Sequence, residues 1–381
     1  MFNEINVHTG GIGTSLELYP NVEKVKEKEF RATFEIKTKA LYGKLPVAFR
    51  MMQEILTESK LTDERRLKEI LSMAKSRLQM RFQSSGHTTA ALRAMSYASP
   101  LSKLKDLTSG IGYYEIVKQI EEHFEEEKDT LIKNLQTLTK LLFRPENMMV
   151  SYTAAREGME GLEKLVSELK AKLFTEPVQG QPCVIHCEKK NEGFKTSSKV
   201  QYVARAGNFI DGGASYTGAL QILKVILSYD YLWQNVRVKG GAYGCMSNFT
   251  RIGDGYFVSY RDPNLEKTNE IYEGVSEYLR QFSVGERDMT KYIIGTISNK
   301  DVPRTPQMQG SISKTAYFSN VTEDMLQKER NQILGAQKED IQKLAALVEA
   351  VLSDDQICVV GSETAIEKAE DVFMEVKPLI G

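Results

Sequence analysis

The chain has 381 residues, of which 41% are hydrophobic and 27% charged, and its formal net charge is -1. This composition is typical of a soluble globular protein, and the near-neutral charge argues against nucleic acid or an anionic membrane as a partner. We find no run of the ~20 apolar residues that a membrane span needs, and no signal-peptide pattern. Four unevenly spaced cysteines argue against a disulfide framework, so we expect a cytoplasmic protein large enough for two domains.

The first half of the chain predicts two strands followed by helices. Residues 14–19 and 31–37 alternate polar and apolar side chains with the period of a strand. Residues 45–57 place apolar side chains on one side of a helix, and the stretch Thr62-Asp63-Glu64 is expected to cap a long amphipathic helix. The remaining expected elements are helices up to residue 142, a strand at 148–152 and a helix at 160–173.

The second half repeats this order of strands and helices. Its predicted elements are strands at 183–187 and 199–205, a helix from 216 towards 237, strands at 243–250 and 256–261, helices at 265–282 and from 283, a strand at 356–361 and a helix at 365–376. The strand and helix that close the first half recur about one domain length later, which indicates a duplication. We therefore expect an α+β fold of two homologous domains, residues 1–176 and 177–381, each an antiparallel-rich sheet covered by helices on one face. The join falls at 174–181, which has linker composition.

The histidines and cysteines of this chain do not predict a metal site. None of the four histidines lies in a His-Glu-x-x-His or His-x-x-Glu-His helix. The nearest alternative is the run from Cys183 through His186 to Cys187. In a strand, the two cysteines share one face and His186 points to the other, whereas zinc needs its ligands on one side with a fourth ligand. Buried strand cysteines are the better interpretation.

The most informative segment is Arg237-Val238-Lys239-Gly240-Gly241-Ala242-Tyr243-Gly244. Arginine supplies a permanent cation, and tyrosine supplies an O–H that can donate to a developing negative charge. This pair suits a site where a carbonyl oxygen becomes an oxyanion. The glycines permit unusual φ values or a close approach of a ligand to the backbone. From the residues alone, a plain glycine-rich turn between a helix and a strand is the alternative.

Two aromatic side chains near this segment and one histidine have structural interpretations. Tyr231 and Trp233 lie at helical spacing close to Arg237, which favours packing in the core. His87 precedes a predicted helix, where capping or packing is the expected role.

Four stretches, His8 to Ile12, Ser85 to His87, Arg237 to Gly244 and Asp301 to Pro306, resemble a known protein family. They are similar to the C-terminal half of the pitrilysin/insulinase family of zinc metallopeptidases, in the branch that contains the presequence protease of organelles. The resemblance implies four homologous α+β domains in two halves that enclose a peptide chamber. This chain corresponds to the third and fourth domains.

The resemblance also assigns roles to residues. It implies that Arg237 and Tyr243 are catalytic, that Gly240, Gly241 and Ala242 lie against the substrate, and that zinc is bound by an N-terminal half absent from this chain. The expected function is the substrate-enclosing half of a zinc metalloendopeptidase that degrades short unfolded peptides, with this chain inactive by itself. The expected partners are peptide substrates and the zinc-bearing half. The alternative is a non-catalytic peptide-binding or partner subunit of a two-chain peptidase.

Overall fold

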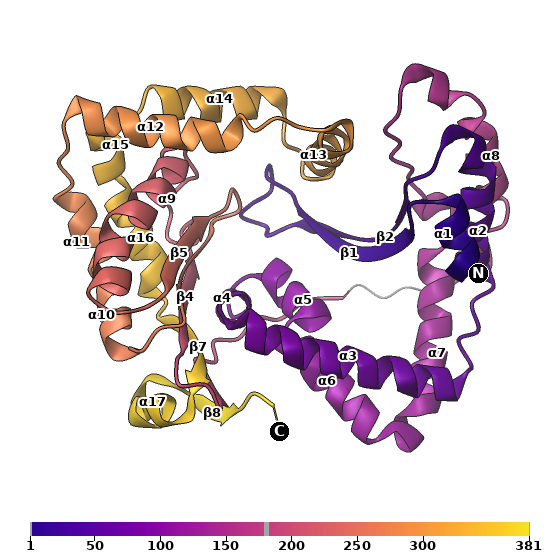
Figure 1. Cartoon of the computed structure of the whole chain (residues 1–381), viewed down its shortest axis with the longest axis horizontal. Helices are drawn as coiled ribbons and strands as arrows, with labels where there is room; N and C mark the ends of the chain where they lie inside the picture. The colour runs from indigo at the N-terminus through magenta and orange to yellow at the C-terminus, as the bar shows by residue number, and fades with distance from the viewer. Residues whose placement is uncertain (1, 179–182, 381) are drawn as a thin grey trace.

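The computed structural model describes residues 2–178 and 183–380. In these residues, a two-stranded sheet lies in the first half of the chain and a six-stranded sheet in the second, and most of the remainder is helical (Figure 1). The predicted α+β class is therefore confirmed. None of the helices in these two ranges is long and apolar enough to cross a membrane.

The first half consists of an arched β-ribbon and a group of helices. Strands β1 (Ile12–Pro20) and β2 (Phe30–Thr38) pair antiparallel, as the alternating pattern predicts. The helices are α1 (Phe2–His8), α2 (Leu45–Thr57), α3 (Glu64–Ser84), α4 (Gly86–Met95), α5 (Pro100–Ser109), α6 (Ile111–Glu122), α7 (Phe124–Leu142) and α8 (Leu162–Lys170). The Asp63 side chain accepts a hydrogen bond from the backbone N of Arg66 at 3.0 Å, which confirms the predicted cap of α3.

The second half is built around a mixed sheet of strand order β5-β6-β4-β7-β3-β8. Strand β3 runs parallel to both of its neighbours, and the other neighbouring pairs are antiparallel. The strands are β3 (Glu192–Thr196), β4 (Tyr202–Asn208), β5 (Gly244–Phe249), β6 (Asp254–Tyr260), β7 (Gln356–Ser362) and β8 (Glu375–Pro378). The helices are α9 (Ala219–Tyr229), α10 (Glu266–Glu273), α11 (Val275–Arg280), α12 (Glu286–Lys300), α13 (Pro306–Phe318), α14 (Glu323–Leu334), α15 (Lys338–Gln342), α16 (Leu344–Ser353) and α17 (Glu363–Lys368).

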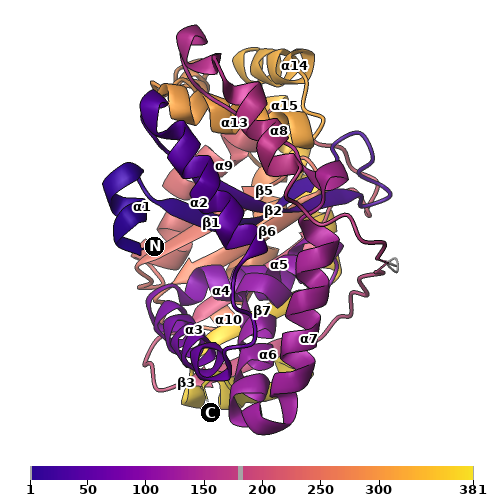
Figure 2. The same cartoon turned by 90° about the vertical axis from the view of Figure 1, so that its right-hand side faces the viewer.

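Both faces of the six-stranded sheet are buried. Side chains alternate between the faces: Val203 and Val359 join a core with α9, α11 and α16, whereas Ala204 and Cys358 join a second core. That second core is completed by α3, α4 and α6 of the first half. Helix α4 contacts β4, β6 and β7, and Figure 2 shows it lying across these strands. The two halves of the chain therefore share a hydrophobic core.

A buried charged network also joins the halves across this face. Arg93 of α4 donates to both carboxylate oxygens of Glu192 in β3, at 2.5 and 2.8 Å, and to Asp106 of α5 at 2.7 Å. All three side chains are buried. Burial by itself would raise the pKa of Glu192, but the hydrogen bond and charge of Arg93, together with Lys377, outweigh burial and lower it to about 2.

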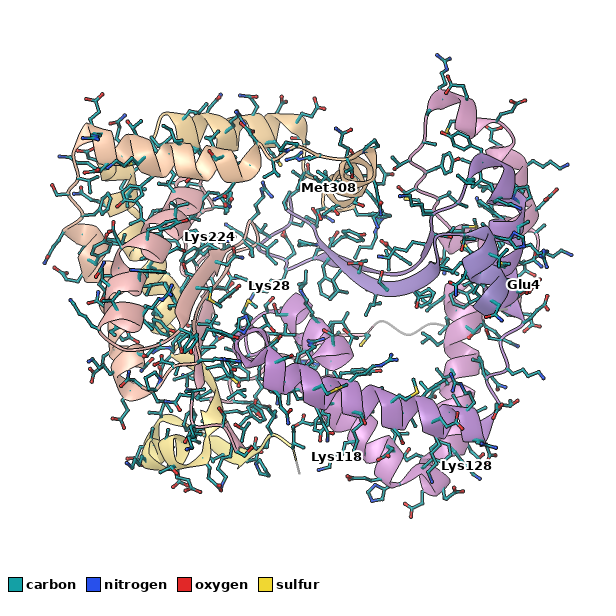
Figure 3. All side chains as sticks on the ribbon, in the orientation of Figure 1. Glu4, Lys28, Lys118, Lys128, Lys224 and Met308 are labelled. Carbon is teal, nitrogen blue, oxygen red and sulfur yellow. The ribbon has the colours of Figure 1, made fainter. Side chains whose placement is uncertain are left out.

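The ribbon forms a second set of contacts between the halves. Lys28, in the turn between β1 and β2, lies 2.8 Å from Asp211, and Figure 3 shows it where this turn meets the second half. Farther along the ribbon, Glu35 forms an ion pair with Lys314 of α13. Tyr19 stacks on Phe318 of the same helix with the ring centroids 4.8 Å apart. The contacts of Glu35 and Tyr19 fix the ribbon against α13.

Three predicted elements are wrong. Residues 148–152 and 183–187 form no strand, because no neighbouring strand supplies the hydrogen bonds that a sheet needs. The predicted helix at 365–376 ends at Lys368, and the chain then forms β8, which pairs with β3. The predicted join at 174–181 runs into residues 179–182, which lie outside the described residues. The domain boundary stays a prediction.

Candidate active-site loop

The predicted site begins on a short π-helix, η4 (Trp233–Val238), which follows α9. The backbone N of Lys239 donates to the carbonyl of Gln234 at 3.0 Å, an i to i-5 bond. Such turns are rare and occur frequently at functional sites. Arg237 lies on the last turn of this helix and is exposed.

The turn after η4 requires both of its glycines. A Cβ on Gly240 would lie 2.4 Å from the carbonyl oxygen of Val236, too close for any side chain. Gly241 has a φ of +81°, a conformation that favours glycine. Its backbone N donates to the carbonyl of Arg237 at 2.9 Å, which closes the turn. The side chain of Ala242 is buried in the core, so contact with a substrate at this position would involve the backbone.

Tyr243 leaves this turn pointing outward. Its side chain is 67% exposed, although its backbone N is fixed by a 3.0 Å hydrogen bond to the carbonyl of Tyr260. The next residue, Gly244, begins β5 and pairs with Tyr260 of β6. A rigid backbone therefore presents an accessible phenol.

Arg237 and Tyr243 have different side-chain neighbours. The guanidinium of Arg237 lies over the ring of Trp233, 3.9 Å from its centroid, a short cation–π contact. Trp233 is 37% exposed, so the predicted role of this residue in the core is wrong. Tyr231 does pack, because it is partly buried against the core and its hydroxyl donates to the carbonyl of Ile271 at 2.9 Å.

Sequence reasoning missed a second arginine at this site. The guanidinium of Arg261 lies 5.7 Å from the ring centroid of Tyr243 and 5.6 Å from that of Tyr260. Arg261 follows the last residue of β6, so the register of the hairpin places it opposite Tyr243. Only the hairpin register could have revealed this neighbour, and the sequence pattern does not specify it.

This surface carries two exposed arginines, Arg237 and Arg261. In residues 2–178 and 183–380, neither Arg237 nor Arg261 pairs with a carboxylate, and each contacts an aromatic ring instead. An exposed phenol with the Arg261 guanidinium near its ring can donate a hydrogen bond to an oxyanion or a carbonyl and stabilise its charge.

The described residues do not fit a zinc ion. They contain no group of three or more His, Cys, Asp or Glu side chains placed to bind a metal. The candidate run from Cys183 to Cys187 is not a strand, and Cys183 is exposed. Burial raises the pKa of the Cys187 thiol, which disfavours the thiolate that zinc binds. Buried strand cysteines are thus not observed at this position.

Comparison with protein families identifies the chain. Residues 191–363 match the PreP C-terminal domain, and residues 1–120 match the domain associated with subfamily C of the M16 peptidases. Presequence protease 1 of Arabidopsis thaliana, a chloroplastic and mitochondrial protein, is 29% identical over 97% of this chain and 34% of its own length. The chain belongs to the M16 peptidase family. It corresponds to the C-terminal half of such a peptidase, as the motifs predict.

A further relative and two solved structures are also similar to this chain. Protein HypA of Clostridium perfringens is 39% identical over 99% of this chain and 38% of its own length. The chain thus spans about a third of the length of the curated relatives it matches. The M16 inactive domain from Pseudomonas fluorescens matches 91% of this chain and 80% of its own with a TM-score of 0.53 and 13% identity. Pitrilysin matches 92% of this chain and 35% of its own with a TM-score of 0.56 and 14% identity. At these identities the structures show the fold alone.

Proposed function

We propose that this chain is the substrate-enclosing C-terminal half of a zinc-dependent metalloendopeptidase that degrades short unfolded peptides. In this proposal Arg237 and Tyr243 face the substrate, and an N-terminal half holds the zinc. The main support for the proposal is the Tyr243 side chain, which is exposed although its backbone is held next to the β5–β6 hairpin. The similarity of the chain to presequence proteases adds to this support.

The two side chains suit different parts of peptide hydrolysis. Tyr243 would donate its O–H to the carbonyl oxygen as negative charge develops there. Arg237, held over Trp233, would bind a neighbouring substrate carbonyl or stabilise the same charge. The turn at Gly240 and Gly241 leaves backbone close to the surface, where an extended peptide could lie against it. Zinc enters the proposal only as part of the other half.

Reconstitution tests whether this chain is part of an enzyme. The chain is mixed with the N-terminal half that carries the His-x-x-Glu-His motif, and cleavage of a quenched fluorogenic peptide is followed. We expect cleavage in the mixture and none with either half alone. The matched control is Arg280→Ala, an exposed arginine that forms ion pairs with Glu277 and Glu349, and it should cleave like wild type. A mixture that binds the peptide without cleaving it would support the non-catalytic peptide-binding subunit instead.

A further inference from the structure

Arg261 has a backbone conformation that arginine rarely adopts. Its φ is +48°, in the left-handed region, although it follows directly after a regular strand. Non-glycine residues in such conformations persist where the surrounding structure imposes them, and they occur often at functional sites.

The residues after Arg261 hold this conformation in place. Asp262 is buried and exchanges two backbone hydrogen bonds of 2.9 Å with Gln201. Its carboxylate accepts hydrogen bonds from the hydroxyl of Thr268 at 2.7 Å and the backbone N of Asn264 at 2.9 Å. The side-chain amide of Asn264 in turn donates to the carbonyl of Gly240 at 2.6 Å. The segment that carries Arg261 is therefore tied to the turn that carries Tyr243.

The ring of Tyr260 also lies near the guanidinium of Arg261. His87 of α4 contacts this ring edge-on with the centroids 4.9 Å apart, and Tyr202 lies 5.7 Å away. Arg261 lies within 6 Å of the centroids of the Tyr243 and Tyr260 rings. In the described part of the chain, no carboxylate pairs with Arg261. Its guanidinium lies beside the rings of Tyr243 and Tyr260 instead.

We infer that Arg261 is a positioning residue that holds the ring of Tyr243 and places a positive charge beside that ring. The inference rests on the proposed function, in which Tyr243 donates to the substrate oxyanion. The strained backbone serves this arrangement, because Arg261 leaves the strand in the left-handed region at the point where its guanidinium lies near both rings.

A double-mutant cycle tests whether Arg261 acts through Tyr243. In the two-half mixture, Arg261→Ala should lower kcat about 3- to 30-fold, the range expected for a cation–π contact, with KM within about twofold of wild type. In the Tyr243→Phe background the same change should cost less than about twofold. If the fold losses in kcat of Arg261→Ala and Tyr243→Phe multiply in the double variant, the inference is overturned, because Arg261 then acts independently of the hydroxyl. If Arg261→Ala has wild-type kinetics while Tyr243→Phe lowers kcat, the inference about Arg261 is also overturned. The proposed function is then still supported.

Two further variants separate the side chain from the backbone. Arg261→Gly removes the guanidinium and relieves the left-handed strain, whereas Arg261→Ala removes the guanidinium and keeps the strain. Equal losses of kcat in both assign the effect to the guanidinium. A loss in Arg261→Ala that Arg261→Gly restores would assign it to the backbone and overturn the inference. Arg261→Lys keeps the charge without the planar group and should recover part of the loss.

A readout without catalysis uses the isolated chain. With 3-fluorotyrosine at position 243, the fluorine resonance should move in both Arg261→Ala and Arg261→Gly and stay in place in Arg280→Ala. An unchanged resonance in the two Arg261 variants would show that the guanidinium does not contact this ring, whatever the activity of the mixture.

Discussion

At the scale of single residues, the turn from Gly240 to Tyr243 divides its roles between backbone and side chains. Gly240 has no room for a Cβ, Gly241 needs a positive φ, and Ala242 fills the core. These residues fix the backbone so that Tyr243 can remain exposed without the loop losing its shape. The structure therefore contains the glycine-rich turn, and the active-site role of its neighbours stays a prediction that this turn can accommodate.

Gly240→Ala tests this division. Its new methyl group would meet the backbone carbonyl of Val236, so we expect a loss of about 1–3 kcal/mol in the free energy of unfolding. The measurement is urea unfolding followed by circular dichroism. Gly43→Ala is the matched control, since nothing lies within 4 Å of its Cβ position, and it should stay near wild type. Equal urea midpoints of unfolding for Gly240→Ala and Gly43→Ala would mean that the turn tolerates a side chain at position 240.

The sequence specifies this site only in part. Residue types made Arg237 and Tyr243 candidates, because their chemistry suits an oxyanion. Their catalytic role rests on the family resemblance and stays a prediction. The stacking of Trp233 on Arg237 and the approach of Arg261 to Tyr243 depend on helix geometry and hairpin register. Neither is encoded by spacing along the chain, so both were missed.

At the scale of elements, the strand pattern predicts well where a partner strand is present, in the exposed ribbon as well as in the buried sheet. Strands β1, β4, β6 and β7 lie close to their expected positions, and helix α2 has its predicted bounds. The failures at 148–152 and 183–187 have one cause, because a strand-like pattern forms a strand only beside a partner. The coverage of the second sheet face by α4 was also not predictable, since it depends on contacts between distant parts of the chain.

The ion pair between Arg93 of α4 and Glu192 of β3 predicts that the free energy of unfolding depends on pH. The pKa of Glu192 falls from 4.5 to about 2 on folding, so its carboxylate stabilises the fold above pH ~4.5. That contribution, on the order of 3 kcal/mol, should disappear as the pH falls from ~4.5 towards 2. Glu192→Gln should lose about 3–5 kcal/mol at pH 7, because Arg93 would keep an incompletely paired buried charge. It should also flatten the acid limb of the stability curve.

The control for this prediction is Glu115→Gln. Glu115 is half-exposed and lies 3.1 Å from Lys377, so its loss should cost less than about 1 kcal/mol. An acid limb that is as steep in Glu192→Gln as in wild type would rule out this carboxylate as its source.

At the scale of the whole molecule, we expect the shared core to make the two halves unfold as one cooperative unit. Ala94 lies on α4 in the first half and is fully buried against the sheet of the second. The protein has one tryptophan, Trp233, so its fluorescence reports on the second half alone. A change in α4 should therefore be detected by a probe in the other half of the chain.

Ala94→Asp tests this coupling. It buries an unpaired charge between the halves and should lower the free energy of unfolding by at least about 3 kcal/mol. We expect the unfolding midpoints from Trp233 fluorescence and from circular dichroism to fall together. Thr88→Asp, on an exposed position of the same helix, should leave both midpoints nearly unchanged. A fluorescence midpoint that stays at the wild-type value in Ala94→Asp would show that the halves unfold independently.

The central claim is that Tyr243 contributes its hydroxyl to peptide cleavage in an enzyme completed by a zinc-bearing half. The most direct measurement is kcat at saturating peptide for the two-half mixture made with Tyr243→Phe, which removes one oxygen atom from an exposed side chain. The proposal predicts a fall in kcat of about 10²- to 10³-fold with little change in KM. A kcat within twofold of wild type would contradict it and leave the segment as a structural turn.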